Sequence, residues 1–202
     1  IITTSLPFVV EAKALAAFSN GSSVESDEEF RARILLSMAD KSTAGSEETY
    51  KSFTFSADER IEDVAVLNGV AGVVNVFYYS SAADELMQTR IEDMLNKEIV
   101  RPLSDNPQIT TATEVPFDVV AQLKILPNQE TATVYSNAME SLTAGIATLK
   151  QIATDITLSE INDFLKVDGV KEVVITSPAA NVGVADNEIG VNGANTITYT
   201  II

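Results

Sequence analysis

The residue types that carry out most protein chemistry are absent from this chain of 202 residues. It contains no Cys, no His and no Trp. Without Cys there is no thiolate nucleophile, zinc–thiolate site or disulfide, and without His there is no imidazole ligand or Ser-His-Asp machinery. The sequence also lacks a dinucleotide-binding or P-loop glycine pattern, and no Ser stands three residues before a Lys. We therefore predict no enzyme, no catalytic residue and no cofactor.

Carboxylates are the one reactive group in excess. There are 29 Asp and Glu against 13 Lys and Arg, giving a formal net charge of -16. Two carboxylates can hydrolyse a glycoside once the fold brings them together. So many acids favour no particular pair, however, and the missing Trp removes the usual platform for a sugar. The acidic excess also predicts no nucleic-acid partner and no anionic membrane partner.

Two acidic segments are candidates for a metal site, and a structural explanation accounts for both. Residues 25–29 hold four acids, but Ser26 and Glu29 have the spacing of a capping box, and consecutive carboxylates on a helix point in different directions. Asp186-Asn187-Glu188 resembles an oxygen-rich calcium loop without its Asp-x-Asp-x-Asp-Gly order. A polar turn explains this second segment equally well. We predict no metal site, and a calcium ion near Asp186 stays an open alternative.

Two arginines have acidic neighbours that indicate ion pairs. Arg60 stands between Asp58/Glu59 and Glu62/Asp63, and Arg101 lies close to Asp105. We interpret both arginines as anchors that fix loops.

The elements that must position these side chains form two groups along the chain. In the first group, Phe30, Ile34 and Met38 recur every four residues and predict a helix over 26–39. Ser46 opens a short helix carrying Tyr50 and Phe53. The remaining predictions are a hairpin of strands 61–67 and 73–79 joined by Asn68-Gly69, with the second strand buried on both faces, and a helix over 82–97 capped by Ser81. The Pro-containing segment 101–107 ends this group.

The second group contains the clearest strand. Residues 113–126 alternate apolar and polar side chains, with Pro116 indicating an edge or a bulge near the start. Asn128 is the expected cap of a helix that carries Val134, Ala138, Leu142, Ile146 and Leu149. A capping box of Thr157 and Glu160 predicts a short helix, followed by a strand over 170–176. The tail 177–195 is rich in Asn and Gly, and residues 197–201 alternate as a final strand.

These elements predict an α+β fold of two small α/β units, each with helices packed on a mainly antiparallel or mixed sheet. The expected divisions are 1–24, 25–106 and 107–202. The chain begins Ile1-Ile2-Thr3-Thr4 without an initiator Met, a run typical of the middle of a strand. We interpret 1–24 as the remnant of a truncated N-terminal region and linker.

Several segments together resemble one family, the baseplate J-like proteins of contractile phage tails. Residues 25–33 resemble its Glu-Ser-Asp-Glu-x-Φ-Arg-x-Arg signature, and Val100-Arg101-Pro102-Leu103-Ser104-Asp105 resembles its Val-Arg-Pro-Leu-Thr-Asp. Three further blocks follow the order of the family, at 44–50, 56–66 and 169–182. At Glu59 the family usually has Pro, and its members carry a substantial region before the first signature. The resemblance covers about residues 20–200.

The resemblance implies structural work and brings no catalytic residues with it. It implies a subunit of a baseplate wedge that assembles around the hub, in a phage or prophage tail or a related injection device. The expected partners are other baseplate wedge and hub proteins, in an oligomer within the full assembly. The expected location is a virion or tail-like particle assembled in the bacterial cytoplasm. The alternative is a secreted or surface-displayed adhesin-like module without catalysis.

Charge is distributed unevenly between the two halves. Residues 102–202 hold twelve acids but only four basic side chains, Lys124, Lys150, Lys166 and Lys171. A region with so few basic side chains is expected to attract a positively charged partner surface by long-range electrostatic steering. We therefore expect partner binding through this half to weaken as salt concentration rises.

Overall fold

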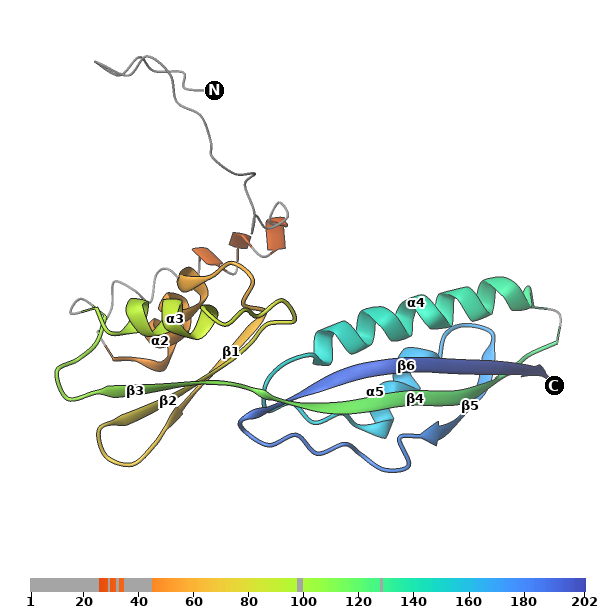
Figure 1. Ribbon diagram of the computed structural model, residues 1–202. Helices are drawn as coiled ribbons and strands as arrows, with labels where there is room; N and C mark the ends of the chain where they lie inside the picture. Colours follow the sequence, from red (N-terminus) through yellow and green to blue (C-terminus); the bar gives the residue numbers. More distant parts are fainter. Residues whose placement is uncertain (1–25, 29, 32, 35–44, 98–99, 128) are drawn as a thin grey trace, which may run out of the picture.

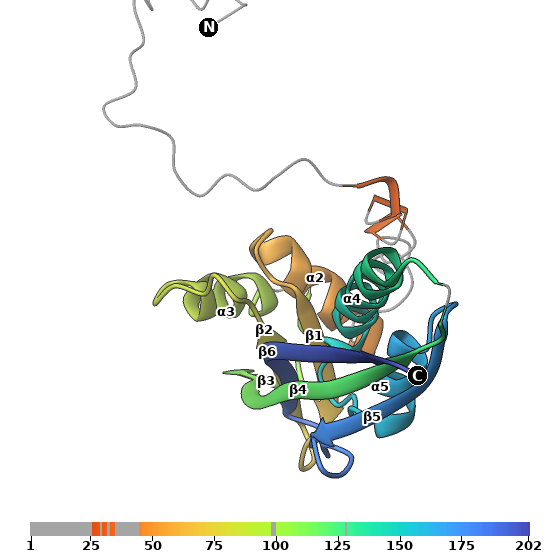
Figure 2. The same cartoon turned by 90° about the vertical axis from the view of Figure 1, so that its right-hand side faces the viewer.

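The computed structural model describes residues 26–28, 30–31, 33–34, 45–97, 100–127 and 129–202. Two α/β units follow one another along an elongated molecule, as Figure 1 shows from the side. Figure 2 shows the same molecule turned by 90°. The predicted α+β class with two units on mixed sheets is therefore confirmed.

The first unit is a three-stranded sheet in the order β1-β2-β3. Its elements are α2 (Glu47–Ala57), β1 (Asp63–Asn68), β2 (Val73–Tyr79), α3 (Met87–Leu95) and β3 (Asn106–Thr111). The hairpin predicted from Asn68-Gly69 is confirmed, because β1 and β2 pair antiparallel. The third strand, β3, lies parallel to β2 on its other side. Helix α3 makes the crossover that this parallel pair requires.

The core of the first unit lies between its sheet and both helices. Tyr50 of α2 and Ile91 of α3 pack with Val76 of β2. Side chains at the end of β2 are buried on both faces of the sheet, because Tyr78 joins this core and Tyr79 joins a second apolar cluster toward the other unit. That strand is therefore buried on both sides over its C-terminal part, as its apolar run predicts.

Helix α3 begins later than the sequence predicts, and Ser81 is not its cap. The helix starts at Met87 after Leu86, which makes no side-chain cap. The Ser81 N–H is taken by the Glu62 carboxylate, Oε1, at 2.6 Å. The Asp84 carboxylate accepts from the Leu86 N–H at 3.0 Å while also binding arginine side chains. These contacts hold residues 81–86 as turns and leave them outside the helix.

The second unit is a three-stranded sheet in the order β5-β4-β6. Its elements are β4 (Thr113–Ile125), α4 (Thr131–Leu149), α5 (Leu158–Leu165), β5 (Val170–Ser177) and β6 (Glu188–Ile201). The central strand β4 pairs antiparallel with β5 and parallel with β6. Both helices cover the face of β4 that carries its odd-numbered residues, among them the fully buried Val119, Leu123 and Ile125.

The alternating strand and the second capping box are confirmed. Thr157 Oγ1 accepts from the Glu160 N–H at 3.2 Å, and the Glu160 carboxylate accepts from the Thr157 N–H at 3.1 Å. Helix α4 starts at Thr131 with Glu130 before it, so Asn128 is not its cap; the structure of Asn128 itself is outside the described residues. Pro116 lies where β4 has β6 alone as a neighbour, before β5 joins at Val120. That position is the edge that the proline predicts.

The last strand is longer than its sequence indicates. It starts at Glu188, nine residues before the alternating run at 197. The Gly and Asn residues that suggested a loop accommodate an irregularity in the pairing, since the register shifts between Phe117 and Val119. There the Asp118 carboxylate accepts from the Ala194 N–H at 2.7 Å, and a Cβ on Gly193 would lie 2.5 Å from that carboxylate. Glycine therefore lets the strand pass this point.

The change between units occurs at one residue. Strand β3 ends at Thr111 and β4 starts at Thr113, with the buried Ala112 between them. The expected division between 106 and 107 falls six residues earlier, at the start of β3. The helix expected over 26–39 is described only in part: residues 27–28, 30–31 and 33–34 are helical, and Phe30 N–H donates to Ser26 O at 2.9 Å. Glu29 and the segment 35–44 lie outside the described residues.

Candidate assembly surfaces and the junction between the units

The described residues contain no group of three or more acids that could hold a metal ion. Asp186-Asn187-Glu188 forms a turn, in which the Glu188 carboxylate accepts from the Ala185 N–H at 2.9 Å. Within the same described residues, no helix is long and apolar enough to span a bilayer. The absence of a cofactor and of catalysis stays a prediction.

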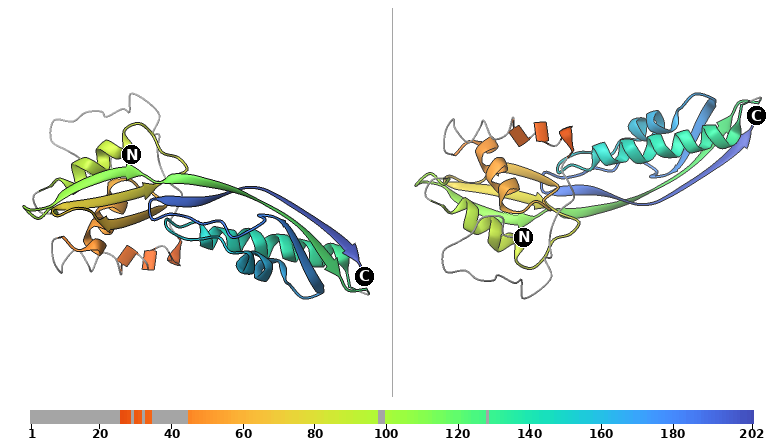
Figure 3. Two further views of the ribbon diagram at one scale, coloured as in Figure 1. Left: turned by 90° about the horizontal axis from the view of Figure 1, so that it is seen from below. Right: turned by 90° about the horizontal axis from the view of Figure 1, so that it is seen from above.

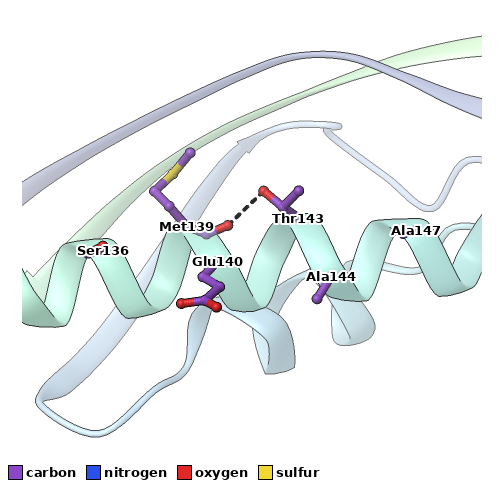
Figure 4. Close-up of a pocket in the computed structure, with 6 residues that line it drawn as sticks. All are labelled: Ser136, Met139, Glu140, Thr143, Ala144 and Ala147. Atoms are coloured by element: carbon purple, nitrogen blue, oxygen red, sulfur yellow. Dashed lines mark hydrogen bonds between the residues drawn. The ribbon is translucent and has the colours of Figure 1, made fainter.

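A shallow depression in the described part of the chain lies along one helix. Figure 4 shows its lining, which comes from a single face of α4: Ser136, Met139, Glu140, Thr143, Ala144 and Ala147. Across the 19 residues of α4, Glu140 is the one charged side chain. A depression with one carboxylate and otherwise small or apolar side chains offers no acid–base pair.

Four charged side chains form a cluster at the end of the first sheet. Asp58 accepts from the Arg60 and Arg90 guanidinium groups at 2.7 and 2.8 Å, and Asp84 bridges the same arginines at 2.7 Å. The Asp58 side chain is only 8% exposed. Hydrogen bonds from Arg60, joined by those from Arg90, lower the pKa of Asp58 to about 2 even though burial opposes the shift. This cluster ties the loop before β1 to α3.

An ion pair joins the two units. Lys150, at the end of α4, places its Nζ 2.6 Å from Glu62 Oε2 of the first unit and 4.8 Å from the centre of the Tyr79 ring. Burial raises the pKa of Glu62, but hydrogen bonds from Lys150 and Ser81 outweigh it and lower that pKa overall. Tyr79 in turn donates its hydroxyl to Glu114 of β4 at 3.1 Å. Four side chains from separate parts of the chain thus meet at the junction.

Backbone and apolar contacts complete the junction. Asp63 Oδ2 accepts from the Ile152 N–H at 2.6 Å, so a first-unit carboxylate holds the segment after α4. Beneath these polar groups Tyr79, Ala112, Ile152 and Ile189 form a buried apolar cluster. Apolar burial and polar contacts therefore both contribute to joining the two units.

The predicted role of Arg60 is confirmed, whereas that of Arg101 is wrong. Arg101 donates to Asn96 Oδ1 at 3.0 Å, while Asp105 accepts from the Tyr50 hydroxyl at 3.0 Å. Asp105 still fixes its loop, but it does so through a tyrosine, and burial followed by this hydrogen bond raises the pKa of Tyr50.

Sequence reasoning did not pair Lys150 with Glu62, because 88 positions separate the two residues. It likewise gave no role to Asp84 or Arg90. The local sequence around Lys150 shows only a single lysine at the end of a predicted helix. That signal does not identify Glu62 as its partner.

Apolar side chains are exposed at both ends of the molecule. In the first unit, Val70 at the hairpin tip is 77% exposed and Leu103 before β3 is 102% exposed. These two loops adjoin, since the Asn106 N–H donates to Gly72 O at 2.7 Å. At the far end of the second unit the exposed apolar residues are Leu126, Tyr199, Ile201 and Ile202.

Comparisons with known proteins find relatives of the second unit and of the longer chain. Residues 117–200 match the model of the Baseplate J-like protein C-terminal domain, which corresponds to the second unit. The chain is 31% identical over 163 residues to Baseplate protein J of Escherichia phage P2. That match includes 79% of this chain and 54% of the relative, so the chain spans about half the length of the curated relative it matches. The chain belongs to the baseplate J-like protein family, as its sequence blocks predict.

A solved structure has the same fold over most of the chain. The cryo-EM structure of the anti-feeding prophage baseplate, six-fold symmetrised, matches with a TM-score of 0.54 at 10% sequence identity. The match covers 83% of this chain and 42% of that chain. At this identity the likeness concerns the fold, which thus includes both units and their succession along the chain.

Proposed function

We propose that this chain is a structural, non-enzymatic subunit of a contractile-tail baseplate and acts through protein–protein contacts. The observation that carries the proposal is the 31% identity to Baseplate protein J of phage P2, which extends over 79% of the chain and therefore over both units. The fold of an anti-feeding prophage baseplate protein supports it. The shallow surface of α4 and the exposed apolar ends also suit a scaffold better than an enzyme.

The proposal also includes the binding partners of the protein and its location. We propose that other wedge proteins and the hub are the partners, that the subunit is part of an oligomer in the full assembly, and that it resides in a virion or tail-like particle assembled in the bacterial cytoplasm. Nucleic acid and membrane are not among the proposed partners, because a net charge of -16 disfavours both.

The decisive experiment follows the protein in its own host. Tail-like particles are purified from cells that carry a tagged full-length gene, and the baseplate fraction is probed for the tag. We expect the tag in intact particles and, after their dissociation, in complexes with neighbouring baseplate proteins. Recovery only from the medium or from the cell surface, without particles, would contradict the proposal and favour the adhesin-like alternative. Deletion of the gene should leave tubes and sheaths that do not join into tails.

We also propose that the two units are separate structural domains. The support is that each sheet has its own apolar core on its own pair of helices. Limited proteolysis of the full chain tests this division. Cleavage between the units is expected only after the junction has been weakened.

The acidic second unit is proposed to meet a basic surface of its partner. Residues 102–202 hold four lysines and twelve acids. Two of these lysines, Lys124 and Lys150, already form ion pairs with Glu172 and Glu62. Association with the partner should slow as the salt concentration rises from 0.05 to 0.5 M, because screening shortens the reach of the charges. An association rate that does not change with salt would contradict this part of the proposal.

A further inference from the structure

The backbone passes from one sheet to the next at a single residue. The Ala112 N–H donates to Tyr78 O in the first sheet at 2.8 Å, and the next N–H, that of Thr113, donates to Asn187 O in the second unit at 3.0 Å. Figure 3 shows this part of the backbone, in green, running from one unit into the other. Among the described residues, the helices and strands pack chiefly against elements of their own unit. A rotation about the backbone bonds of Ala112 would therefore bend the molecule without breaking either sheet.

A tight turn ends helix α4 at this junction. Lys150 follows the last helical residue with a φ of -75° and a ψ of 68°, and the Gln151 N–H donates to Leu149 O at 2.8 Å. These values are typical of an inverse γ-turn. Because the turn ends the helix within one residue, the chain leaves the helix axis directly. It continues as a short segment, residues 150–153, which we call the strap.

The strap is bound to both units through neighbouring groups. Lys150, its first residue, forms the ion pair with the first unit described above. The Ile152 N–H also goes to the first unit, where Asp63 Oδ2 accepts it at 2.6 Å. The following N–H, that of Ala153, donates instead to Glu188 O of the second unit at 3.0 Å. Two consecutive backbone donors are thus held by different units.

The backbone of the strap is strained at Ala153. Its φ is 61°, and it is the one non-glycine residue with a positive φ in the described part of the chain. A side chain in this left-handed region raises the free energy, whereas glycine adopts the same conformation readily. Such strain persists only where the surroundings impose it. Here Asp63 and Glu188 hold the N–H groups on the two sides of the Ile152–Ala153 step.

We propose that the strap is a latch, which holds the two units in one orientation through the charges of Glu62 and Asp63 and releases them when those charges are lost. Release lets Ala153 leave the left-handed region, so the strain favours the released state. Ala112 is then the hinge about which the units bend. This inference concerns the junction alone and does not depend on the proposed function.

The charges around Glu62 determine how the latch responds to pH. Burial raises the pKa of Glu62, but hydrogen bonds from Lys150 and Ser81 lower it overall. Its pKa in the released state is the ordinary one, about 4.3. The contribution of Glu62 to the latch is therefore complete above about pH 5 and is lost as the pH falls through the lowered value. The titratable side chains that meet at the junction are Glu62, Asp63, Tyr79, Glu114 and Lys150.

Distances between two spin labels test the latch, and the absence of Cys from the chain allows the labels to be placed at will. Val70→Cys and Thr143→Cys put one label on an exposed residue of each unit. We expect one narrow distance distribution at pH 7 and a second, growing population as the pH falls toward 3.5. Amide hydrogen exchange within each unit, measured at the same pH values, separates release of the strap from unfolding.

The same labels report the effect of removing the two charges at pH 7. Glu62→Gln combined with Asp63→Asn should raise the released fraction about tenfold or more, because two charged acceptors become neutral. Glu172→Gln is the matched control, since it breaks the Lys124–Glu172 pair inside the second unit, and should leave the distribution narrow. A double variant with the narrow distribution of the wild type at pH 7 would overturn the latch.

Ala153→Gly should act in the opposite direction. Added to the double variant, it removes the strain of the closed strap and should lower the released fraction about fivefold or more. Ala185→Gly adds the same backbone freedom at an exposed turn residue of the second unit and is the control. A released fraction that rises with Ala153→Gly, or that changes equally with both glycines, would overturn the role of strain. Incorporation of the protein into tail particles is a separate measurement, and its failure would leave the latch intact.

Discussion

The two units have the same sheet pattern and hold it together differently. In each, a central strand pairs antiparallel with one neighbour and parallel with the other, and the helices lie on one face. In the first unit the loops are fixed by charged and phenolic groups, namely the Asp58–Arg60–Asp84–Arg90 cluster and the Tyr50–Asp105 bond. In the second unit long elements enclose an apolar core, and Lys124–Glu172 is an exposed pair beside it.

The difference shows how element length decides what must stabilise a fold. Helix α4 has 19 residues and strand β4 has 13, so apolar burial alone can order them. Helices α2 and α3 have 11 and 9 residues, and isolated helices of that length are marginal in water. The first unit therefore depends more on specific polar contacts. The stability of the first unit should therefore respond to pH and to the loss of charged side chains. The stability of the second unit should respond to changes in the volume of its core side chains.

The largest expected effect comes from the core of the second unit. Leu142 is fully buried between α4 and β4, and Leu142→Ala should lower the free energy of unfolding of this unit by about 2–5 kcal/mol, because it removes packed methyl groups and leaves a cavity. Amide hydrogen exchange followed separately in each unit measures the loss. Thr143→Ala on the exposed face of the same helix is the control and should change it by about 0.5 kcal/mol or less. Equal losses in the two variants would show that burial does not dominate here.

Gly145 also tests how far the second unit depends on core packing, in this case by adding volume. A Cβ at this helical position would lie 2.4 Å from the ring of Phe164 on α5. Alanine normally favours a helix over glycine by about 1 kcal/mol. Here Gly145→Ala should destabilise the second unit by about 1–3 kcal/mol, because α4 and α5 must separate. The double variant with Phe164→Leu should recover part of the loss in thermal unfolding. A stabilised Gly145→Ala protein would mean that the helices approach less closely than described.

Acid should weaken the first unit before the second. The pKa of Asp58 is lowered to about 2 by its hydrogen bonds to arginine, below the ordinary value of about 3.9 in the unfolded chain. Its contribution is therefore complete above about pH 5 and is lost as the pH falls through 4 toward 2.

Asp58→Asn should remove about 1–2 kcal/mol at pH 7 and flatten this part of the pH profile, since a neutral amide cannot bind both guanidinium groups as strongly. Urea unfolding at pH 3 and pH 7, read by exchange in each unit, gives the comparison. A pH profile that is the same for wild type and variant would exclude Asp58 as its origin.

The smallest energetic effect is expected at the junction. Lys150 and Glu62 are 32% and 35% exposed, so Lys150→Met should change stability by about 1 kcal/mol or less. The orientation of the units should change more visibly. Spin labels on one introduced Cys in each unit should give a broader distance distribution. Lys124→Met breaks an ion pair inside the second unit and should leave that distribution narrow. Broadening in both variants would mean that the ion pair does not set the orientation.

The features that sequence predicted are those whose signal is local. The alternation over 113–125 and the Thr157–Glu160 capping box are complete within a few residues, and both are confirmed. The Asn68-Gly69 turn likewise joins the strands it predicts. Family membership was also accessible, because several short blocks occur in order and each is contiguous.

The features that sequence missed depend on distant partners. Strand β3 contains Pro107 and polar residues, and it is a strand because β2 lies parallel beside it. The early part of β6 contains Gly and Asn and is extended because β4 supplies its ladder. Helix α3 starts late because Asp84 is engaged by Arg60, in the loop before β1, and by Arg90 of α3 itself. The Lys150–Glu62 pair joins two units whose packing no local pattern encodes.

The single residue Ala112 between β3 and β4 has a mechanical consequence. One continuous stretch of backbone, Asn106–Ile125, belongs to both sheets in succession. Tension applied along the long axis would therefore load the β2–β3 and β4–β6 ladders in shear, so that many hydrogen bonds must break together. Such a path transmits a pull from one end of the molecule to the other without first stretching a loop.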